Sequence, residues 1–479
     1  MKATLTPCFP QLIHKVAAMG KRSARSKVSP DSLIDIAAQF KRFLPKDGPE
    51  FPKDDTRRRN RKYPLAMVFW CFIWQVLKPR TSCREVVRQI QTMGETQLLK
   101  YDESTSGYCQ ARIRLPEESL LKAMKDSAAS ADRLNLAGVP GWNRPIQVVD
   151  ATSVTLPDTD ANRKEYPYAP GQKPGCGFPK MKVLGLSSLS SGAILAVSET
   201  GKPTHDIRLF RDIFPLFHPD DIVLGDRGFC SYHAMAKLPT QKVDAVFRLH
   251  QRRILNKRSS RRIGNSDWIS TWSRPAQRPA YIDPDEWDAL PEQIDVRIFC
   301  YRLRRNGFRS QVVWIATTLT DPQTYPAEQI AQLYALRWDI ELCFRNLKST
   351  MGMDELRCRT PKMVRKELLA YMVAHNFIRC LAAEAASDHN VPRCRISFKG
   401  SIDAARCFHS AMYRSGTQGK RKQLHARLLE IIALDLVPER PGRKEPRAIK
   451  RRPKPYPLLT RPRRIYREIP HRGKKRDAA

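Results

Sequence analysis

Acidic side chains are scarce in this chain of 479 residues. It has 48 aspartates and glutamates against 85 lysines and arginines, which gives a net charge of +37 and a pI near 10.1. Such a charge is unusual for an enzyme of small-molecule metabolism. It favours a polyanionic partner, for which nucleic acid is the usual choice and an anionic membrane the competing one.

Long apolar runs and paired cysteines are missing as well. The longest apolar run, at 64–77, is too short to cross a bilayer and predicts a buried helix. We recognise no signal peptide, so we expect a cytoplasmic protein with no membrane partner. The 12 cysteines include no CxxC pair and none at zinc spacing from a histidine. We therefore expect reduced, mostly buried thiols in a reducing compartment.

The sequence pattern changes from helical to strand-forming near residue 146. Residues 1–55 are polar and punctuated by proline, with one helix expected at 30–44. Residues 56–135 predict short helices with a basic start, which suit either a helix-turn-helix type of DNA-reading domain or a helical cap on the next domain. Strands follow at 146–156, 181–199 (a pair around Ser191-Gly192), 221–226 and 244–249, with a helix at 205–217.

A second β-rich stretch follows at about 250 and ends in a hairpin. Its turn signal is Asn306-Gly307, between two strand patterns. Long helical patterns come next, at 334–348 and 361–386, and two more helical patches at 398–437. The last residues, 438–479, are dense in Pro, Lys and Arg, which predicts a disordered tail suited to a phosphate backbone.

The segment at 334–348 predicts one helix with a polar ridge. Tyr334, Arg337, Glu341 and Lys348 fall within an arc of roughly 60° when successive residues turn by about 100°. An apolar stripe runs beside the ridge; its members are Leu333, Leu336, Ile340, Phe344 and Leu347. The helix thus presents one hydroxyl, one acid and two bases along a single line.

Three acids stand out by their context. Asp150 ends the apolar strand pattern IQVVD, Asp226 ends DIVLGD, and Glu341 lies on the polar ridge. A carboxylate at the end of a buried strand is costly unless a cation or hydrogen bonds compensate it. Three convergent carboxylates could bind two Mg²⁺ or Mn²⁺ ions, which is the arrangement for in-line phosphoryl transfer. Asp158 and Asp160 compete with Asp150 but lie in a Pro-bounded loop.

These residues resemble a known family. Tyr334-x2-Arg337-x3-Glu341-x6-Lys348 is similar to the Y-R-E-K signature of DDE transposases in the insertion-sequence 4 family. DATSV at 150–154 and GDRGF at 225–229 resemble that family's two Asp motifs. The resemblance covers about 146–352 well and 56–135 loosely. It implies an α/β, RNase H-like catalytic domain with a β-rich insertion, and cut-and-paste transposition of the protein's own element.

The resemblance also implies roles for single residues. Asp150, Asp226 and Glu341 would be the catalytic metal ligands for two ions, Mg²⁺ or Mn²⁺. Tyr334, Arg337 and Lys348 would hold DNA phosphates, while the plainer interpretation of the two bases is a solvated pair bridging to Glu341. An aromatic residue could receive a base flipped out of a DNA hairpin. Trp314 is near the expected place, although a core position suits it equally; Trp268 and Trp272 are the alternatives, and Trp338 is expected to pack.

Three further features have two interpretations each. Arg227 follows the second Asp and either contacts DNA phosphate or is a surface arginine. His205 and Asp206 either support the site or simply cap a helix through Asp206. The basic run at 252–262 suits DNA better than a solvated loop, given the net charge.

The resemblance sets the expected organisation of the chain. From the N-terminus we expect a segment at 1–55 and a helical DNA-binding domain at 56–140. The catalytic core follows in two parts, at 141–250 and, with the catalytic helix, at 321–390, and the basic β-rich insertion at 251–320 separates them. C-terminal helices at 391–437 and the basic tail at 438–479 complete the chain.

The leading hypothesis is a metal-dependent DNA transposase. It would act on double-stranded DNA, at terminal inverted repeats and target DNA, as a homodimer on paired ends in the bacterial nucleoid. The alternatives are a DNA-binding protein that has lost cleavage and an RNase H-like nuclease without strand transfer. Three acids in a series argue against the first, and the basic insertion with the polar ridge argues against the second.

Overall fold

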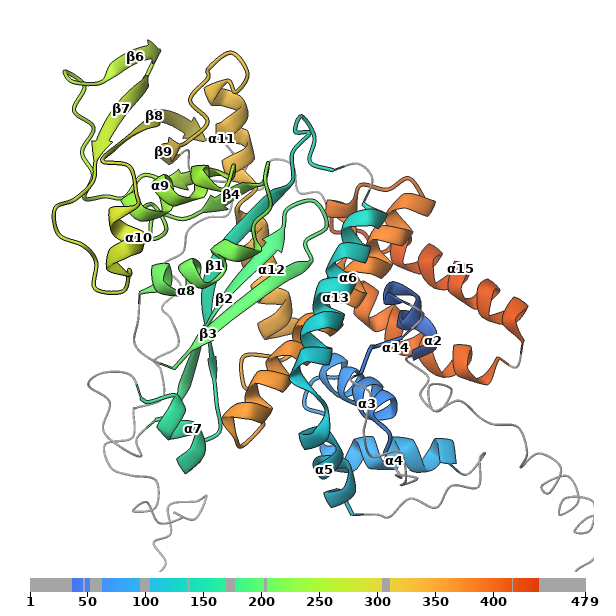
Figure 1. Ribbon diagram of the computed structural model, residues 1–479. Coiled ribbons are helices and arrows are strands. Elements are labelled where there is room, and N and C mark those ends of the chain that lie inside the picture. The colour runs from blue at the N-terminus through green and yellow to red at the C-terminus, as the bar shows by residue number, and fades with distance from the viewer. Residues whose placement is uncertain are drawn as a thin grey trace, which may run out of the picture.

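The computed structural model of the protein is a mixed α/β structure built around one long sheet (Figure 1). It describes residues 37–45, 48–51, 63–94, 104–135, 138–168, 177–201, 205–303, 311–415 and 417–438. The expected turn at Asn306-Gly307, the start of the helix expected at 30–44 and nearly all of the basic tail lie outside these residues.

Nine strands form the sheet in the order β3-β2-β1-β4-β5-β9-β8-β7-β6. Their bounds are β1 Ile146–Thr155, β2 Lys180–Ser188, β3 Ile194–Thr200, β4 Ile222–Gly225, β5 Asp244–Arg248, β6 Arg261–Gly264, β7 Asp267–Ser273, β8 Gln293–Leu303 and β9 Gln311–Thr317. β4 runs parallel to β1 and to β5, and the other pairs are antiparallel.

Two antiparallel strand pairs match the expected hairpins. β2 and β3 pair around Gly192, whose φ of 71° lies in the region that glycine adopts without strain. β8 and β9 form the second pair, and β9 joins β5. The stretch expected as an insertion therefore prolongs the same sheet, and its basic part contains two further strands, β6 and β7, that the sequence pattern did not reveal.

Helices cover both faces of the sheet. Their bounds are α2 Ala37–Phe40, α3 Leu65–Leu77, α4 Cys83–Gly94, α5 Ser106–Arg114, α6 Glu117–Leu134, α7 Asp160–Glu165, α8 Asp206–Asp212, α9 Tyr232–Thr240, α10 Pro284–Asp288, α11 Ala327–Ala335, α12 Trp338–Arg345, α13 Pro361–Asp388, α14 Phe398–Arg414 and α15 Gln418–Leu434. Short 3₁₀ turns lie at Lys41–Phe43, Phe214–Leu216 and Arg393–Arg395, and one π-helical turn, η5, at Asn346–Thr350.

Alternate residues of the central strands belong to two different cores. Ile146, Val148 and Leu224 pack with α3, α6, α12 and α13, whereas Val149 and Val223 pack with α8 and α9 on the other face. We name these the α12 face and the α9 face. The period of two along β1 and β4 thus decides which side chains can reach α12.

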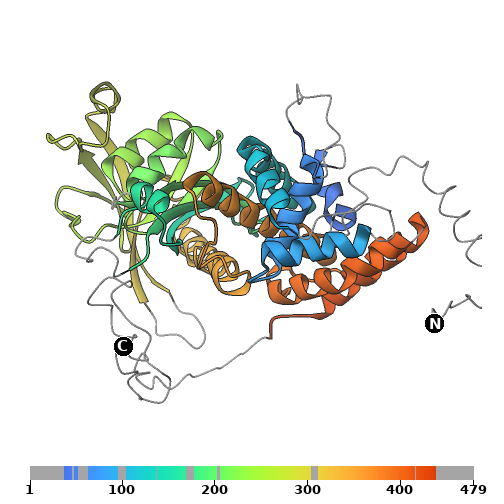
Figure 2. The ribbon, with the colours of Figure 1, turned by 90° about the horizontal axis from the view of Figure 1, so that it is seen from below.

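The N-terminal helices share the core of the α12 face. α3 is the buried helix expected from the apolar run, and together with α6 it packs on α13 (Figure 2). Trp70 stacks on Phe377 of α13 with 5.8 Å between ring centroids. This packing is the helical-cap arrangement; α4 and α5 lie further out, beside α3.

The described cysteines are free thiols, and only Cys394 and Cys407 among them are exposed. Five of these ten cysteines are buried and three are partly buried, so the prediction of mostly buried thiols holds for half of them. Among the described residues no helix is long and apolar enough to span a membrane.

The strands added beyond β5 are held by a buried ion pair. Arg297 of β8 is 1% exposed, and its Nη2 lies 2.6 Å from Asp267 Oδ2 on β7. Its Nη1 donates to the carbonyl oxygens of Leu319 and Tyr325 at 3.3 and 2.6 Å. One guanidinium therefore ties β7 and β8 to the segment that leads into α11.

Asp267→Ala is expected to lower the free energy of unfolding by about 3–5 kcal/mol, because it leaves a buried guanidinium without its counter-charge. Urea unfolding followed by circular dichroism measures this loss. The control is Glu430→Gln, which breaks an exposed pair with Arg427 and should cost less than about 1 kcal/mol. Equal losses in the two variants would contradict the structural role of the buried pair.

Candidate active site

The pairing of β1 with β4 sets the first two acids side by side. Val148 is paired with Leu224 in this parallel ladder. Asp150 lies two residues beyond Val148 on β1, and Asp226 lies two residues beyond Leu224, just past the end of β4 at Gly225. Both positions have the parity of the α12 face, so the two carboxylates point to the same side of the sheet.

β1 runs through Asp150, as the strand predicted at 146–156 requires, although the apolar pattern IQVVD ends there. It continues to Thr155, because β2 stays paired with it over that length while β4 stops at Gly225. Asp150 therefore lies where β1 loses one neighbour and keeps the other. The apolar pattern marked the end of burial on both faces and not the end of the strand.

Backbone amides fix the orientation of both carboxylates. Asp150 Oδ1 accepts from the Ala151 N–H at 2.8 Å, and Asp226 Oδ1 accepts from the Gly228 N–H at 2.7 Å. A Cβ at residue 228 would lie 3.0 Å from that same oxygen, so a side chain there would crowd the acid. Glycine at 228 thus allows the turn after β4 to hold Asp226.

Another glycine brings α12 close to the acids. Gly185 of β2 is the antiparallel partner of Asp150, and a Cβ on it would lie 3.0 Å from the ring of Phe344. The bare backbone lets Phe344 pack against β2, and Glu341 is one helical turn earlier on α12. The sequence analysis missed Gly185. A glycine within a strand pattern can mark a close approach of another element, and this was the only signal in the sequence.

The helix expected at 334–348 is interrupted. α11 ends at Ala335 and α12 begins at Trp338. Between them the N–H groups of Leu336 and Arg337 bond three residues back, at 3.0 and 3.1 Å, in the tighter 3₁₀ manner. The interruption moves Leu336 off the buried stripe, and it is 40% exposed. Trp338, which was expected to pack, is 47% exposed.

Arg337 bridges two of the acids from this interruption. Its Nη2 lies 3.3 Å from Glu341 Oε1, and its Nη1 lies 3.9 Å from Asp150 Oδ2. The residue is 9% exposed, and its Nε is buried without a hydrogen-bond partner in the described residues. The contact of Arg337 with Glu341 is the pair within one helix that was the alternative to a phosphate-binding role. Arg337 also contacts Asp150, which that alternative did not include.

The three acids share one electrostatic environment. The pKa of Asp150 is raised to about 6, first by burial, with Asp226 and Glu341 adding to the rise. The Ala151 N–H and Arg337 act in the opposite direction. Asp226 and Glu341 therefore both lie close enough to Asp150 to act on its carboxylate.

The other ridge residues lie around the acids. Burial raises the pKa of Tyr334 to about 12, with Arg337 and Arg248 opposing the rise and Asp226 adding to it. Lys348 Nζ donates to Thr152 Oγ1 at 3.3 Å, two residues beyond Asp150 on the same face of β1. Tyr334 is thus near Asp226 and Lys348 near the far part of β1. Arg248, at the end of β5, was missed by the sequence analysis.

A preformed metal cluster is not part of this arrangement. Within the described ranges no group of three His, Cys, Asp or Glu side chains is arranged to hold a metal ion. The positive charge between Asp150 and Glu341 is the guanidinium of Arg337. The donor set is nevertheless all carboxylate oxygen, which is the chemistry that Mg²⁺ and Mn²⁺ require.

The structure does not bring Trp314 together with the acids. Its neighbour Ile315 belongs to the α12 face, while Trp314 packs against the core of the α9 face. There its ring stacks on Trp268, with 6.1 Å between centroids, and Lys257 lies over Trp268. This is the core position that suited the sequence equally well. Trp272, the other alternative, lies under Arg253.

The side chains after Asp226 form a basic group. Arg227 is exposed and its Nη1 donates to Gln251 Oε1 at 2.8 Å. Burial lowers the pKa of His250, and the positive charges of Arg252, Arg227, Arg253 and His205 lower it further. Asp206 does not cap α8 but pairs with Lys182 at 2.6 Å. The basic run at 252–262 therefore begins beside the second acid.

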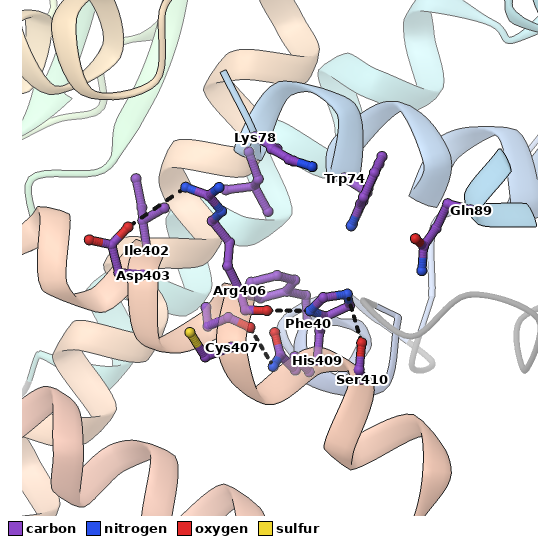
Figure 3. A pocket seen from close by; sticks show the side chains of 13 residues that line it. Phe40, Trp74, Lys78, Gln89, Ile402, Asp403, Arg406, Cys407, His409 and Ser410 are labelled. Atoms are coloured by element: carbon purple, nitrogen blue, oxygen red, sulfur yellow. Dashed lines mark hydrogen bonds and ion pairs between the residues drawn. The ribbon is translucent and has the colours of Figure 1, made fainter. Parts of the chain in front are cut away.

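A cavity of about 480 Å³ lies away from the acids, between α2, α3, α4 and α14 (Figure 3). Trp74 and Phe40 form part of its lining, and Arg406 spans its wall toward Asp403, 3.7 Å away. None of the three acids is among its lining residues. The candidate chemistry therefore belongs to the surface beside α12 and not to this cavity.

Two acids on neighbouring parallel strands, with a third on a helix across them, define the DDE class of polynucleotidyl transferases. The transposase DDE domain family matches residues 141–377. The transposase InsG of insertion sequence element IS4 from Escherichia coli K12 is 23% identical over 405 residues, covering 83% of this chain and 88% of the relative. The chain contains a transposase DDE domain and is similar over most of its length to the IS4 transposase, and it is a DNA transposase.

Two further comparisons are more limited. The transposase of insertion sequence element IS421 from Escherichia coli is 40% identical over 62 residues, which are 13% of this chain and 16% of the relative. A solved piggyBac transposase synaptic complex with hairpin DNA covers 87% of this chain and 85% of its own, at 11% identity and a TM-score of 0.42.

Asp150→Asn is expected to stabilise the protein above pH 6 when chelator is present. The pKa of Asp150 is higher in the folded state than in the unfolded state, so ionisation of this carboxylate lowers the free energy of unfolding. The loss is absent below the ordinary pKa near 3.8 and complete above about 6. A rise of about two units corresponds to about 2–3 kcal/mol.

Urea unfolding between pH 4 and pH 8 measures this difference between the wild type and Asp150→Asn. The two proteins should converge at pH 4 and separate as the pH rises through 6. A difference that stays constant over this range would contradict the raised pKa.

Proposed function

We propose that this transposase cleaves DNA and transfers strands at the terminal inverted repeats of its own element, with Asp150, Asp226 and Glu341 as the catalytic acids. The observation that supports the proposal is the parallel pairing of β1 with β4 up to Val148 and Leu224, because Asp150 and Asp226 each follow this pair by two residues. The contacts of Arg337 with Asp150 and Glu341 support the inclusion of Glu341, and so does the rise in the pKa of Asp150, which comes first from burial and then from the charges of Asp226 and Glu341.

We propose that the three acids hold two divalent ions, Mg²⁺ or Mn²⁺. When bound, such a pair of ions activates a water or a 3′-hydroxyl and stabilises the leaving oxygen of an in-line displacement. The surplus of negative charge around Asp150 favours cations at this place. Arg337 supplies positive charge to Asp150 and Glu341 in the present arrangement, so metal binding includes a shift of its guanidinium.

Tyr334, Arg337 and Lys348 would position the DNA backbone. The planar fork of Arg337 can bind two oxygens of one phosphate, and Lys348 offers a point charge. The Tyr334 hydroxyl is protonated at neutral pH, as in any tyrosine, so it can donate a hydrogen bond to a phosphate oxygen. Arg227 and its basic neighbours extend this surface on the side of Asp226.

The finer fold assignment is an RNase H-like core formed by β1 to β5 with α8, α9, α12 and α13, with β6 to β9 as the insertion. Its support is the mixed five-stranded part of the sheet, helices on both faces and the acids at β1 and after β4. We further propose a homodimer on paired DNA ends in the bacterial nucleoid, with the N-terminal helices and the basic tail as additional DNA contacts.

Two other functions remain distinct from this proposal. A protein that binds DNA without cleavage does not need three neighbouring carboxylates. Their negative charges repel one another, and this repulsion lowers the stability of the fold. A nuclease without strand transfer would cut but would not join a 3′-hydroxyl end to target DNA. Joining of a pre-cut end to a target duplex separates the second possibility from transposition.

Glu341→Gln is expected to abolish cleavage and to leave DNA binding largely intact. The substitution keeps the size of the side chain and removes one anionic metal ligand. Loss of a ligand should exceed the 10–100-fold effect of losing an outer-shell partner, so cleavage should fall by more than about 100-fold. Affinity for DNA should change by less than about threefold, because no phosphate contact is removed.

A labelled duplex carrying the element's terminal repeat, incubated with Mg²⁺, measures cleavage, and fluorescence anisotropy on the same duplex measures binding. The matched control is Glu430→Gln on the surface of α15, which should cut at the wild-type rate. Normal cleavage by Glu341→Gln would show that the assignment of the three acids is wrong.

A further inference from the structure

A second, smaller cavity lies beside the catalytic helix. Its volume is about 180 Å³, and its walls come from α12, β1, the turn after β2, α13, the segment 393–398 and Val437. Val148 of β1 is part of the lining and precedes Asp150 by two residues on the same face. The cavity therefore begins about 7 Å along the strand from the first acid.

Three arginines line this cavity: Arg345 of α12, Arg379 of α13 and Arg393. We call it the arginine pocket. Arg345 is exposed and Arg379 is partly buried, and in the described part of the chain no carboxylate lies within 4 Å of either guanidinium. Arg393 donates to the carbonyl oxygens of Ser191 and Leu189 at 3.2 and 3.1 Å, which fixes its plane.

Arg379 is the most constrained of the three. Its Nη2 meets the sulfur of Cys343 at 3.4 Å, and its Cζ lies 5.0 Å from the ring centroid of Phe398. Its Nε is buried and has no hydrogen-bond partner among the described residues. A Cβ at residue 192 would lie 3.0 Å from the Arg379 Cζ, so glycine in the β2–β3 turn makes room for the guanidinium.

A cationic cavity with a buried, unsatisfied N–H is suited to an anion. Ser187 and Asn346 add side chains that can donate hydrogen bonds to the same lining, whereas the Ser188 hydroxyl donates to Asp132 Oδ1 at 2.6 Å. A phosphate group matches this donor set, because planar guanidinium forks bind its oxygens in pairs. Two features distinguish the pocket from a set of solvated surface arginines: the buried Nε of Arg379 and the fixed plane of the Arg393 guanidinium.

The exposed side of α12 connects the pocket with the acids. Trp338 and Leu342 are 47% and 43% exposed, and Arg345 continues this side of the helix into the pocket. Glu341 and Arg337 lie on its other side, toward Asp150. DNA bound at the proposed acids and lying along this exposed side would have its backbone within reach of the arginine pocket.

We propose that the arginine pocket binds a backbone phosphate of DNA near the phosphate that is cut. The inference rests on the proposed position of the catalytic acids, and it assigns a separate group of residues to holding the duplex. The separation along β1 corresponds to about two base-pair rises of 3.4 Å. The phosphate belongs to the element's end or to target DNA, which share this chemistry.

The test compares Arg345→Gln and Arg379→Gln, singly and combined, with Arg427→Gln on the surface of α15 as the matched control. Affinity for the labelled terminal-repeat duplex is measured by fluorescence anisotropy in chelator over a range of salt. Loss of one phosphate contact should reduce the slope of log K against log salt by about 0.9. The double variant should bind about tenfold more weakly, and Arg427→Gln should bind as the wild type does.

Capture of a target duplex by the pre-cut end complex distinguishes the two sources of phosphate. Weaker end binding supports a phosphate of the element's end, and unchanged end binding with weaker target capture supports a phosphate of target DNA. Wild-type affinity, salt slope and target capture in Arg345→Gln, whose exposed side chain does not support the fold, would overturn the proposal. Because binding is measured without metal, this result is independent of whether Glu341 is catalytic.

Discussion

The parallel pairing of β1 with β4 is the constraint on which the rest of the site depends. It brings Asp150 next to Asp226 although 75 residues separate them in the chain. The same pairing gives both carboxylates the parity of the α12 face. Every other feature of the site, from Gly185 under Phe344 to the interruption before α12, serves to bring Glu341 to this pair.

The proximity of like charges explains the environment of Arg337. Burial raises the pKa of Asp150, the charges of Asp226 and Glu341 add to the rise, and a nearby cation lowers this cost. The guanidinium between Asp150 and Glu341 does so in the structure. The site is therefore arranged for positive charge, which the proposed metal ions and the ridge residues share during catalysis.

Much of this arrangement follows from the sequence, because buried strands and helices carry strong apolar patterns. The patterns located β1, β4, α3 and α13, and they singled out all three acids. They could not reveal the 3₁₀ turn at Leu336-Arg337, since no proline or glycine marks it, nor the exposure of Trp338 that results. The face to which Trp314 points depends on strand parity and pairing, and the arginine pocket joins segments that only the fold brings together.

Cleavage of the element's own end by the wild-type protein tests the central claim most directly. A labelled duplex that joins the terminal repeat to its flanking DNA is incubated with Mg²⁺, with Mn²⁺ or with chelator, and the cut positions are mapped to the nucleotide. The account predicts cuts at the boundary of the repeat with either metal and none in chelator. Specific binding without cleavage under any metal, or cleavage that persists in chelator, would contradict it.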